Sequence, residues 1–251
     1  MTTTADLERV LAAAGCAAPA QWDETTGSTN ATARERAEAG DPEWTLVAAG
    51  HQSEGQGRLG RSWEDRAGAA LLFSVVLRPT IDPPDAGLLP VLAGAAMAEA
   101  AKASTGADIR CKWPNDLLSE NGKVGGVLME SAVAGERLRY AILGAGVNME
   151  PPGGVPGARG LGVDVDPLVL LEAFLVSFRD GYRPGSPGFA ADVVDRWSEV
   201  SATLGRRVEA ALAGDGVVRG IATGIDRHGG LIVETDRGPV TVSSGEVMHL
   251  R

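Results

Sequence analysis

The chain has 251 residues, and 44% of them are hydrophobic, so it can bury a full core and is not expected to be disordered. Its formal net charge of -10 lacks the basic character of a general nucleic-acid binder, and we therefore expect no DNA partner. The two cysteines form no CxxC pair and the three histidines no spaced cluster, which disfavours a disulfide scaffold and a zinc site. With no basic leader and no uninterrupted apolar run of membrane-spanning length, we expect a cytoplasmic protein without a membrane partner.

The first half of the chain predicts helices and strands in mixed order. Continuous apolar runs of four to eight residues indicate strands, whereas apolar residues at helical spacing indicate helices. Gly40 is a typical helix stop, and Ser28 or Thr29 is suited to cap the start of the helix before it. The expected elements are helices at 6–14, 31–39 and 88–103, and strands at 45–49, 70–77 and 109–113.

The second half predicts a hairpin, two helices and then a change of character. After residue 201 the chain consists of short strand-like runs separated by glycine-containing turns, which indicates a small β-barrel. We therefore predict one domain at 1–200 and a second at 201–251. The mixed order favours an α+β sheet with helices on one side over a doubly wound fold. The expected elements are strands at 124–130 and 138–147, helices at 167–182 and 189–199, and strands at 207–212, 217–225, 231–234 and 240–242.

A glycine-rich run, Gly55 to Gly60, is the first candidate for chemistry. Its three glycines allow a sharp bend or a close approach of the backbone to a ligand. Arg58 and Arg61 can present planar donor forks to a phosphate or carboxylate, and Trp63 offers a flat surface to a base. An isolated run of this kind is more often a solvated loop. Its spacing matches GxGxxG, but no helix is predicted to follow, so the dinucleotide-binding interpretation fails.

The second candidate is the segment Lys112-Trp113-Pro114-Asn115-Asp116, followed by Gly122 to Gly126 with Lys123 inside it. Pro114 cannot donate to a β-ladder, so Asn115 and Asp116 are expected on a tight turn, aimed at a ligand or a metal-bound phosphate. An ordinary β-turn would have the same sequence. Two flanking lysines in an acidic protein favour an anion site.

The third candidate is the segment from Gly144 to Asn148, where small residues interrupt an apolar strand. They would leave room for a flat ligand, and Asn148 would emerge at the end of the strand. A β-bulge or close strand packing accounts for the same residues equally well.

In order and spacing, these three segments, together with Gly27-Ser28-Thr29-Asn30 and Gln52, resemble the biotin protein ligase family over roughly residues 22–250. The Lys112 to Asp116 turn paired with Gly122 to Gly126 is the most specific part, because related lipoate ligases do not usually carry both. The resemblance implies an α+β, class II aminoacyl-tRNA synthetase-like catalytic domain with a small C-terminal SH3-like β-barrel.

The resemblance also implies roles for individual residues. Lys123 and Arg58 would be catalytic, facing the biotin carboxylate and the reacting phosphate, and the metal ligands stay unknown. Biotin would be bound by Ser28, Thr29, Asn30, Gln52, Gly55, Gln56, Gly57, Arg58, Lys123, Gly126, Gly144 and Gly146. ATP would be bound by Arg58, Arg61, Trp63, Lys112, Asn115, Asp116, Lys123 and Asn148.

The implied reaction has two steps. Biotin attacks the α-phosphate of ATP, and a lysine on the biotin carboxyl carrier domain of an acyl-CoA or pyruvate carboxylase then takes the biotin from biotinyl-5'-AMP. Because two anions must meet, charge neutralisation by Lys123, Arg58 and Mg²⁺ would dominate catalysis. Residues 54–63 are predicted to be mobile until ligand binds. Gln56 departs from the arginine usual in this loop, which predicts altered loop ordering or retention of the intermediate.

Three alternatives stay open at this point: a lipoate or octanoate ligase, a biotin-sensing repressor, and a binding module without catalysis. About twenty residues precede the first signature segment, which is too few for a helix-turn-helix domain, and the acidic charge also argues against repression. The sequence does not settle the oligomeric state, and it leaves a weak or ligand-dependent homodimer open.

Overall fold

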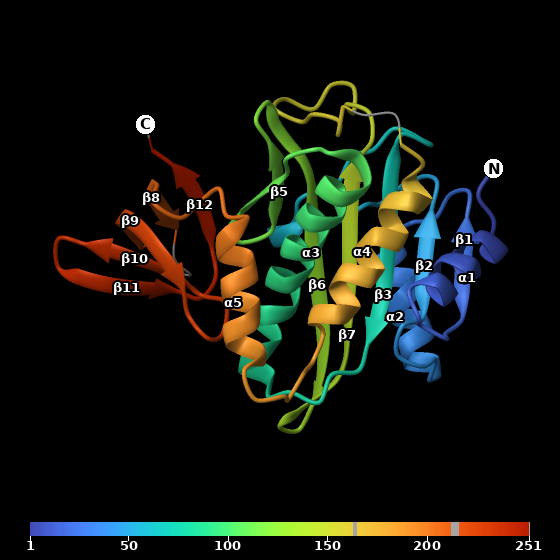
Figure 1. Ribbon diagram of the computed structural model, residues 1–251, viewed down its shortest axis with the longest axis horizontal. Helices are drawn as coiled ribbons and strands as arrows, with labels where there is room; N and C mark the ends of the chain where they lie inside the picture. The colour runs from blue at the N-terminus through green and yellow to red at the C-terminus, as the bar shows by residue number, and fades with distance from the viewer. Residues whose placement is uncertain (163–164, 212–215, 251) are drawn as a thin grey trace.

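Two sheets organise the residues that the computed structural model describes, 1–162, 165–211 and 216–250 (Figure 1). The first has seven strands and is mixed, and the second has five strands and is antiparallel. The strands of the first sheet are β1 (Ala20–Asp23), β2 (Leu46–Ala49), β3 (Ala70–Leu77), β4 (Arg110–Lys112), β5 (Asp116–Ser119), β6 (Gly122–Ala134) and β7 (Arg137–Asn148). Those of the second are β8 (Arg207–Ala211), β9 (Val217–Ile225), β10 (Leu231–Thr235), β11 (Gly238–Val242) and β12 (Glu246–His249).

The strand order of the first sheet is β1-β2-β3-β7-β6-β5-β4, with the long β6–β7 hairpin in its middle. Ser74 of β3 lies opposite Gly144 of β7, and Gly126 of β6 lies opposite Gly146. Because side chains two residues apart on a strand point to the same face, Gly144 and Gly146 leave a shallow strip on one face of β7.

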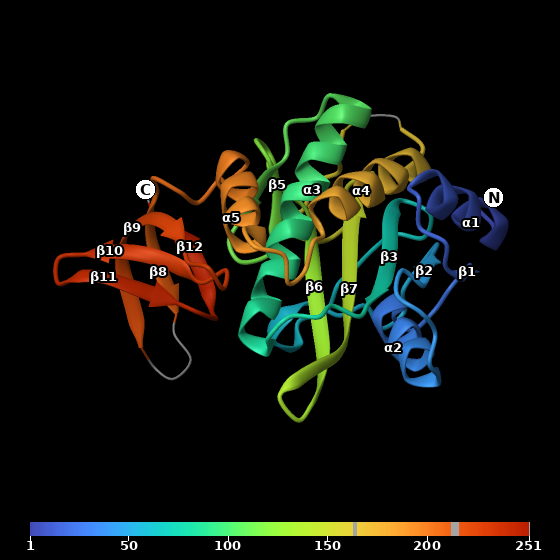
Figure 2. The ribbon, with the colours of Figure 1, turned by 60° about the horizontal axis from the view of Figure 1, so that its bottom comes forward.

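Helices cover both faces of this sheet, so the expectation of helices on one side is wrong. On one face, α3 (Leu88–Thr105) packs beside α4 (Pro167–Gly181), and α1 (Thr4–Ala13) and α5 (Phe189–Glu199) flank this pair (Figure 2). On the other face, α2 (Thr29–Ala39) packs on β2, β3 and β7. All eight residues of β3 are buried, which requires cover on both sides.

Most predicted elements are present within a few residues of their expected bounds, and β3, α5 and β9 have the bounds expected. Three strands, β1, β5 and β12, were not predicted, because four-residue strands with polar members give little alternation to read. The strand expected at 207–212 ends at Ala211, and residue 212 lies outside the described residues. The division at residues 200 and 201 and the closed SH3-like barrel stay predictions.

One segment, Pro83–Thr105, is long and apolar enough by length and composition alone to cross a membrane. Its most apolar window is 72% buried within the fold. Asp85, Glu99 and Lys102 interrupt it, so it contains no uninterrupted apolar run of membrane-spanning length. The segment is best explained as the central core helix, against which α4 and α5 pack.

The second sheet is held to the first by hydrogen bonds around Trp113. The Trp113 backbone N–H donates to Thr203 Oγ1 at 3.0 Å, and its indole Nε1 donates to the Gly229 carbonyl at 2.9 Å. Nearby, His228 Nδ1 lies 2.7 Å from Asp85 Oδ1. Trp113 is 2% exposed, so its two hydrogen bonds form a buried seam that holds the second sheet beside the turn after β4.

The stacked aromatic side chains of α4 give a test of the core. Phe174 is fully buried, with its ring centroid 5.1 Å from Phe73 and 5.6 Å from Phe178. We expect Phe174→Ala to lower the free energy of unfolding by about 3–5 kcal/mol, measured by urea denaturation, because it leaves a cavity. Val176→Ala, on the exposed side of the same helix, should change it by less than about 0.5 kcal/mol. Equal losses in the two variants would contradict this packing.

Cys111 gives a second test, through pH. Burial, with a smaller contribution from Glu99, raises the pKa of the Cys111 thiol from 9.0 to about 12. Above pH 9 the unfolded chain releases this proton and the folded chain keeps it, so stability falls as the pH rises towards 12. The expected slope from this one group is about 1.4 kcal/mol per pH unit. Cys111→Ala should remove that slope in urea titrations at pH 8 to 10.5, and parallel curves for the two proteins would count against it.

Candidate active site

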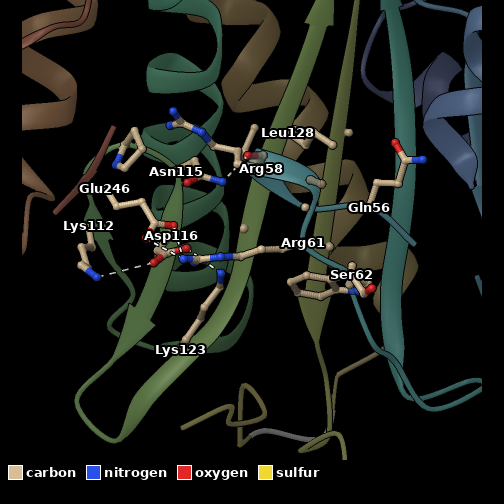
Figure 3. A pocket seen from close by; sticks show the side chains of 18 of the residues that line it. Gln56, Arg58, Arg61, Ser62, Lys112, Asn115, Asp116, Lys123, Leu128 and Glu246 are labelled. Carbon is tan, nitrogen blue, oxygen red and sulfur yellow. Dashed lines mark hydrogen bonds and ion pairs between the residues drawn. The ribbon is translucent and has the colours of Figure 1, made fainter. Parts of the chain in front are cut away.

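A pocket of about 220 Å³ opens where the start of α2, the glycine-rich loop, the turn after β4 and the edge strand β12 meet. Its floor is formed by the middle of β6 and β7. Figure 3 shows the charged side chains of Arg61, Asp116, Lys123 and Glu246 converging from separate segments. The pocket therefore combines residues from both sheets.

One end of the pocket is lined by neutral hydrogen-bonding groups. Ser28, Thr29 and Asn30 begin α2 and are 4–6% exposed. Gln52 Oε1 accepts a hydrogen bond from the Thr29 backbone N–H at 2.7 Å and lies 3.0 Å from the Thr29 hydroxyl. Gln52 is thus fixed with its oxygen on α2, which leaves its amide nitrogen to donate.

The other end is lined by four cationic side chains and two carboxylates. Lys123 Nζ lies 2.6 Å from Asp116 Oδ1, and Lys112 Nζ lies 3.8 Å from Asp116 Oδ2. Arg61 Nη2 lies 2.5 Å from the carboxylate of Glu246, as Figure 3 shows. The fourth cation is Arg58, whose pKa is lowered by burial although Glu246 and Asp116 act in the opposite direction. Cations outnumber anions here, so this end suits an anionic ligand.

The strand glycines make room mainly for the protein's own side chains. A Cβ atom at Gly144 would clash with the Asn30 amide, and one at Gly146 would lie 2.7 Å from the Trp63 ring. Gly126 is more open, with Lys123 Nζ 3.8 Å from the place of a Cβ. All three glycines line the pocket, but the two on β7 do so by seating Asn30 and Trp63, which line it as well.

The glycine-rich loop closes on itself beside the pocket. The Gly57 N–H donates to the Arg61 carbonyl at 2.7 Å, and the Trp63 N–H donates to the Gly55 carbonyl at 2.8 Å. A single 3₁₀ turn (Arg58–Gly60) lies at its tip, and β3 is the next regular element. No α-helix lies between Gly60 and β3 within the described residues, which agrees with the rejection of the dinucleotide-binding interpretation.

Of the site residues expected from the sequence, all but two line the pocket. Gly55 packs behind it, where a Cβ would lie 2.5 Å from the Trp63 carbonyl. The Asn148 side chain donates from Nδ2 to the Arg159 carbonyl at 3.2 Å, and its backbone carbonyl accepts from the Leu161 N–H at 2.7 Å, so Asn148 holds the segment that follows β7. Its expected role in ATP binding stays a prediction.

Sequence reasoning missed several residues that form the site. From the second sheet, Gly245, Glu246, Val247 and Met248 line the pocket, although β12 gave no pattern that pointed there. Behind the neutral end, Ser74 and Glu130 hydrogen-bond to Asn30. Only the strand register brings these two side chains to α2.

The described residues contain no group of three or more His, Cys, Asp or Glu side chains that could hold a metal ion. The two pocket carboxylates, Asp116 and Glu246, each face cationic side chains instead. The residues present therefore do not build a protein-held Mg²⁺ site, and its ligands stay unknown.

The fold and the pocket define an α+β protein whose pocket suits a small molecule with a neutral polar head beside an anionic group. Comparison with known proteins agrees. Residues 23–148 match the model of the biotin/lipoate A/B protein ligase family, and residues 203–250 match the biotin protein ligase C terminal domain. The chain belongs to the biotin/lipoate A/B protein ligase family.

Individual relatives cover most of the chain. It is 36% identical to the biotin–[acetyl-CoA-carboxylase] ligase of Mycobacterium tuberculosis, over 90% of this chain and 87% of that protein. It is 29% identical to the bifunctional ligase/repressor BirA of Bacillus subtilis, over 90% and 72%. The biotin protein ligase from Aquifex aeolicus in complex with biotin and ATP superposes with a TM-score of 0.73 at 25% identity, over 92% and 99%. The expected family and its α+β fold are thereby confirmed.

Proposed function

We propose that the chain is an ATP-dependent biotin protein ligase. It activates biotin to biotinyl-5'-AMP with release of pyrophosphate, then transfers biotin to a specific lysine of a biotin carboxyl carrier domain. The observation that carries the proposal is one pocket with neutral hydrogen-bonding groups at one end and excess positive charge at the other. That polarity fits a molecule with an uncharged cyclic urea and a carboxylate, next to the phosphates of a nucleotide.

In the first step, a biotin carboxylate oxygen attacks the α-phosphorus of ATP in line, forming the mixed anhydride and breaking the bond to pyrophosphate. Two anions approach each other, so the barrier depends on positive charge placed between them. Lys123 and Arg58 supply that charge from the floor and the wall of the pocket. Lys123 is held near the reacting groups by Asp116, which an incoming anion would displace in part.

The remaining residues bind and orient the two substrates. Ser28, Thr29, Asn30 and Gln52 would hold the cyclic urea, with the glycines of the loop, β6 and β7 shaping the cavity. Arg61, Trp63, Lys112, Asn115 and Asp116 would hold the nucleotide, and we keep Asn148 in this group as a proposal. Trp63 supplies a flat apolar surface against Gly146.

In the second step, the unprotonated amine of the acceptor lysine attacks the carbonyl carbon of the anhydride, and AMP leaves. Until then the anhydride must be kept from water. The loop from Gly55 to Trp63 is placed to do this, because it forms one wall of the pocket. Gln56, in place of the usual arginine, removes one charge from that wall.

We also propose the metal ion, the acceptor protein and the cellular compartment of this reaction. Mg²⁺ would accompany ATP as part of that substrate and would supply positive charge beside its phosphates, because the described residues build no metal site of their own. The acceptor belongs to an acyl-CoA or pyruvate carboxylase, and the reaction takes place in the cytoplasm without DNA. A weak or ligand-dependent homodimer is compatible with this scheme.

The decisive measurement is the mass of a carrier domain after incubation with the protein, biotin and MgATP. We expect an increase equal to one biotinyl group, together with biotin-dependent exchange of pyrophosphate into ATP. Lipoate or octanoate in place of biotin should support neither. Exchange with lipoate but not biotin would replace the proposal by a lipoate ligase, and binding without exchange or mass shift would leave a binding module.

Removing the central cation should slow the first step. We expect Lys123→Ala to lower the rate of biotin-dependent pyrophosphate exchange by roughly 10²- to 10³-fold, the effect of losing one preorganised charge contact. Lys102→Ala, which removes an exposed lysine at the end of α3, is the matched control and should leave the rate unchanged. An unchanged rate for Lys123→Ala would remove Lys123 from the mechanism.

The glycine-rich loop should respond to ligand. Trypsin can cut after Arg58 and Arg61, and we expect cleavage there in the free protein to slow when biotinyl-5'-AMP is bound, because the loop then packs on the ligand. Mass spectrometry of the fragments identifies the cut sites. Equal cleavage rates with and without biotinyl-5'-AMP would show that the loop does not order on ligand.

A further inference from the structure

The Asn30 side chain is held by residues that do not line the pocket. Ser74 Oγ lies 2.6 Å from Asn30 Oδ1, and Asn30 Nδ2 donates to Glu130 Oε2 at 2.9 Å. Ser74 is fully buried and Glu130 partly exposed. Both ends of the amide, its oxygen and its nitrogen, therefore have a protein partner before any ligand arrives.

The register of the sheet creates this arrangement. Ser74 of β3 and Leu128 of β6 both lie opposite Gly144 of β7, and Glu130 follows Leu128 by two residues on the same face. The Asn30 side chain extends from α2 and fills the space above Gly144. Its amide therefore meets a hydroxyl from one neighbouring strand and a carboxylate from the other.

The orientation of the Asn30 amide follows from Glu130. A carboxylate only accepts, so Asn30 must turn its NH₂ group towards Glu130 and its oxygen towards Ser74. Ser74 must then donate to Asn30 Oδ1, and its oxygen also lies 2.8 Å from that of the Thr29 hydroxyl, which donates to Gln52 Oε1. Arg34, one turn after Asn30 on α2, places Nη2 3.5 Å from Glu130 Oε1 and pairs with the same carboxylate.

The orientation matters because a cyclic urea presents one carbonyl acceptor flanked by two N–H donors. An asparagine amide can pair with this pattern in one orientation, whereas the flipped amide would set donor against donor and acceptor against acceptor. The penalty for a buried polar group without a partner is large compared with the gain from one hydrogen bond. The pocket therefore needs a device that prevents the flip.

We propose that Ser74 and Glu130 are positioning residues that fix the Asn30 amide and thereby set the hydrogen-bonding pattern offered to the cyclic urea of biotin. The inference rests on the proposed function. It assigns to two side chains behind the pocket wall a part in substrate specificity. They act through Asn30 and touch neither the carboxylate that reacts nor the nucleotide.

The test uses Glu130→Gln and Ser74→Ala in the full-length protein. Glutamine can pair with Asn30 in either orientation, so Glu130→Gln permits the flip. Ser74→Ala removes the donor to Asn30 Oδ1 and leaves the amide held by Glu130 alone. We expect each to raise KM for biotin by roughly 5- to 150-fold, the range that corresponds to one unpaired buried polar group. Because the reacting centre is not touched, kcat and KM for ATP should stay within about 2-fold.

A double variant separates a shared network from two independent defects. If both residues act through Asn30, Glu130→Gln and Ser74→Ala together should raise KM for biotin by less than the product of the single effects. The matched control is Glu38→Gln, which removes a carboxylate that accepts from Tyr140 Oη at 3.0 Å across the same contact between α2 and β7. It should leave KM for biotin unchanged. Thermal unfolding of every variant identifies any loss of folded protein.

Two results would overturn the inference. One is an active wild-type protein whose KM for biotin is the same in Glu130→Gln and Ser74→Ala. The other is an equal rise in KM for biotin and for ATP, which would indicate a general structural defect. An inactive wild-type protein in the carrier assay would instead refute the proposed function, so the two failures are distinguishable.

Discussion

The close approach of α2 to β7 is the constraint on which the site depends. Only a residue without a side chain at Gly144 lets the Asn30 amide lie against the sheet, since a Cβ there would overlap it. Two residues further along the same face, Gly146 receives the Trp63 ring in the same way. The start of the helix and the end of the glycine-rich loop are thus both anchored on one strip of one strand.

Positive charge is concentrated in the pocket, although the molecule as a whole is negatively charged. The chain carries a formal net charge of -10, yet four cations gather at one end of the pocket. They would repel one another if left alone, and Asp116 and Glu246 offset this by lying between them. The carboxylates keep the cations close without cancelling them, so the site attracts anions while the surface as a whole repels them.

Local features were predictable from the sequence and long-range ones were not. The turn from Lys112 to Asp116 and the nearby Lys123 could be placed together, because a short hairpin separates them. The roles of Ser74 and Glu130 depend on the register of β3 and β6 with β7, and they lie 44 and 100 residues from Asn30. A sequence read without that register cannot bring them to one helix.

The sequence did not predict that α2 covers the second face of the sheet, nor that β12 lines the pocket. The two failures have related causes. The apolar run of β3 is equally consistent with helices on one face or on both faces of the sheet. The sequence of α2 is too polar to predict that one face of this helix is buried. β12 contributes Glu246 and Met248 to the pocket only because a separate sheet docks there, and docking between domains leaves little trace in local patterns. The glycines of β7 were correctly placed in the pocket, but the side chains that fill the space above them were not foreseen.

The seam at Trp113 gives the shared pocket a thermodynamic consequence. A ligand that touches both β7 and β12 binds only when the two sheets are docked, so its binding free energy also stabilises their association. Occupied and empty protein should therefore differ in cooperativity as well as in stability, with the two sheets opening as a single unit when the pocket is filled. Docking of the small second sheet is thus coupled to ligand binding. The sheet should be attached more strongly when the pocket is occupied than when it is empty.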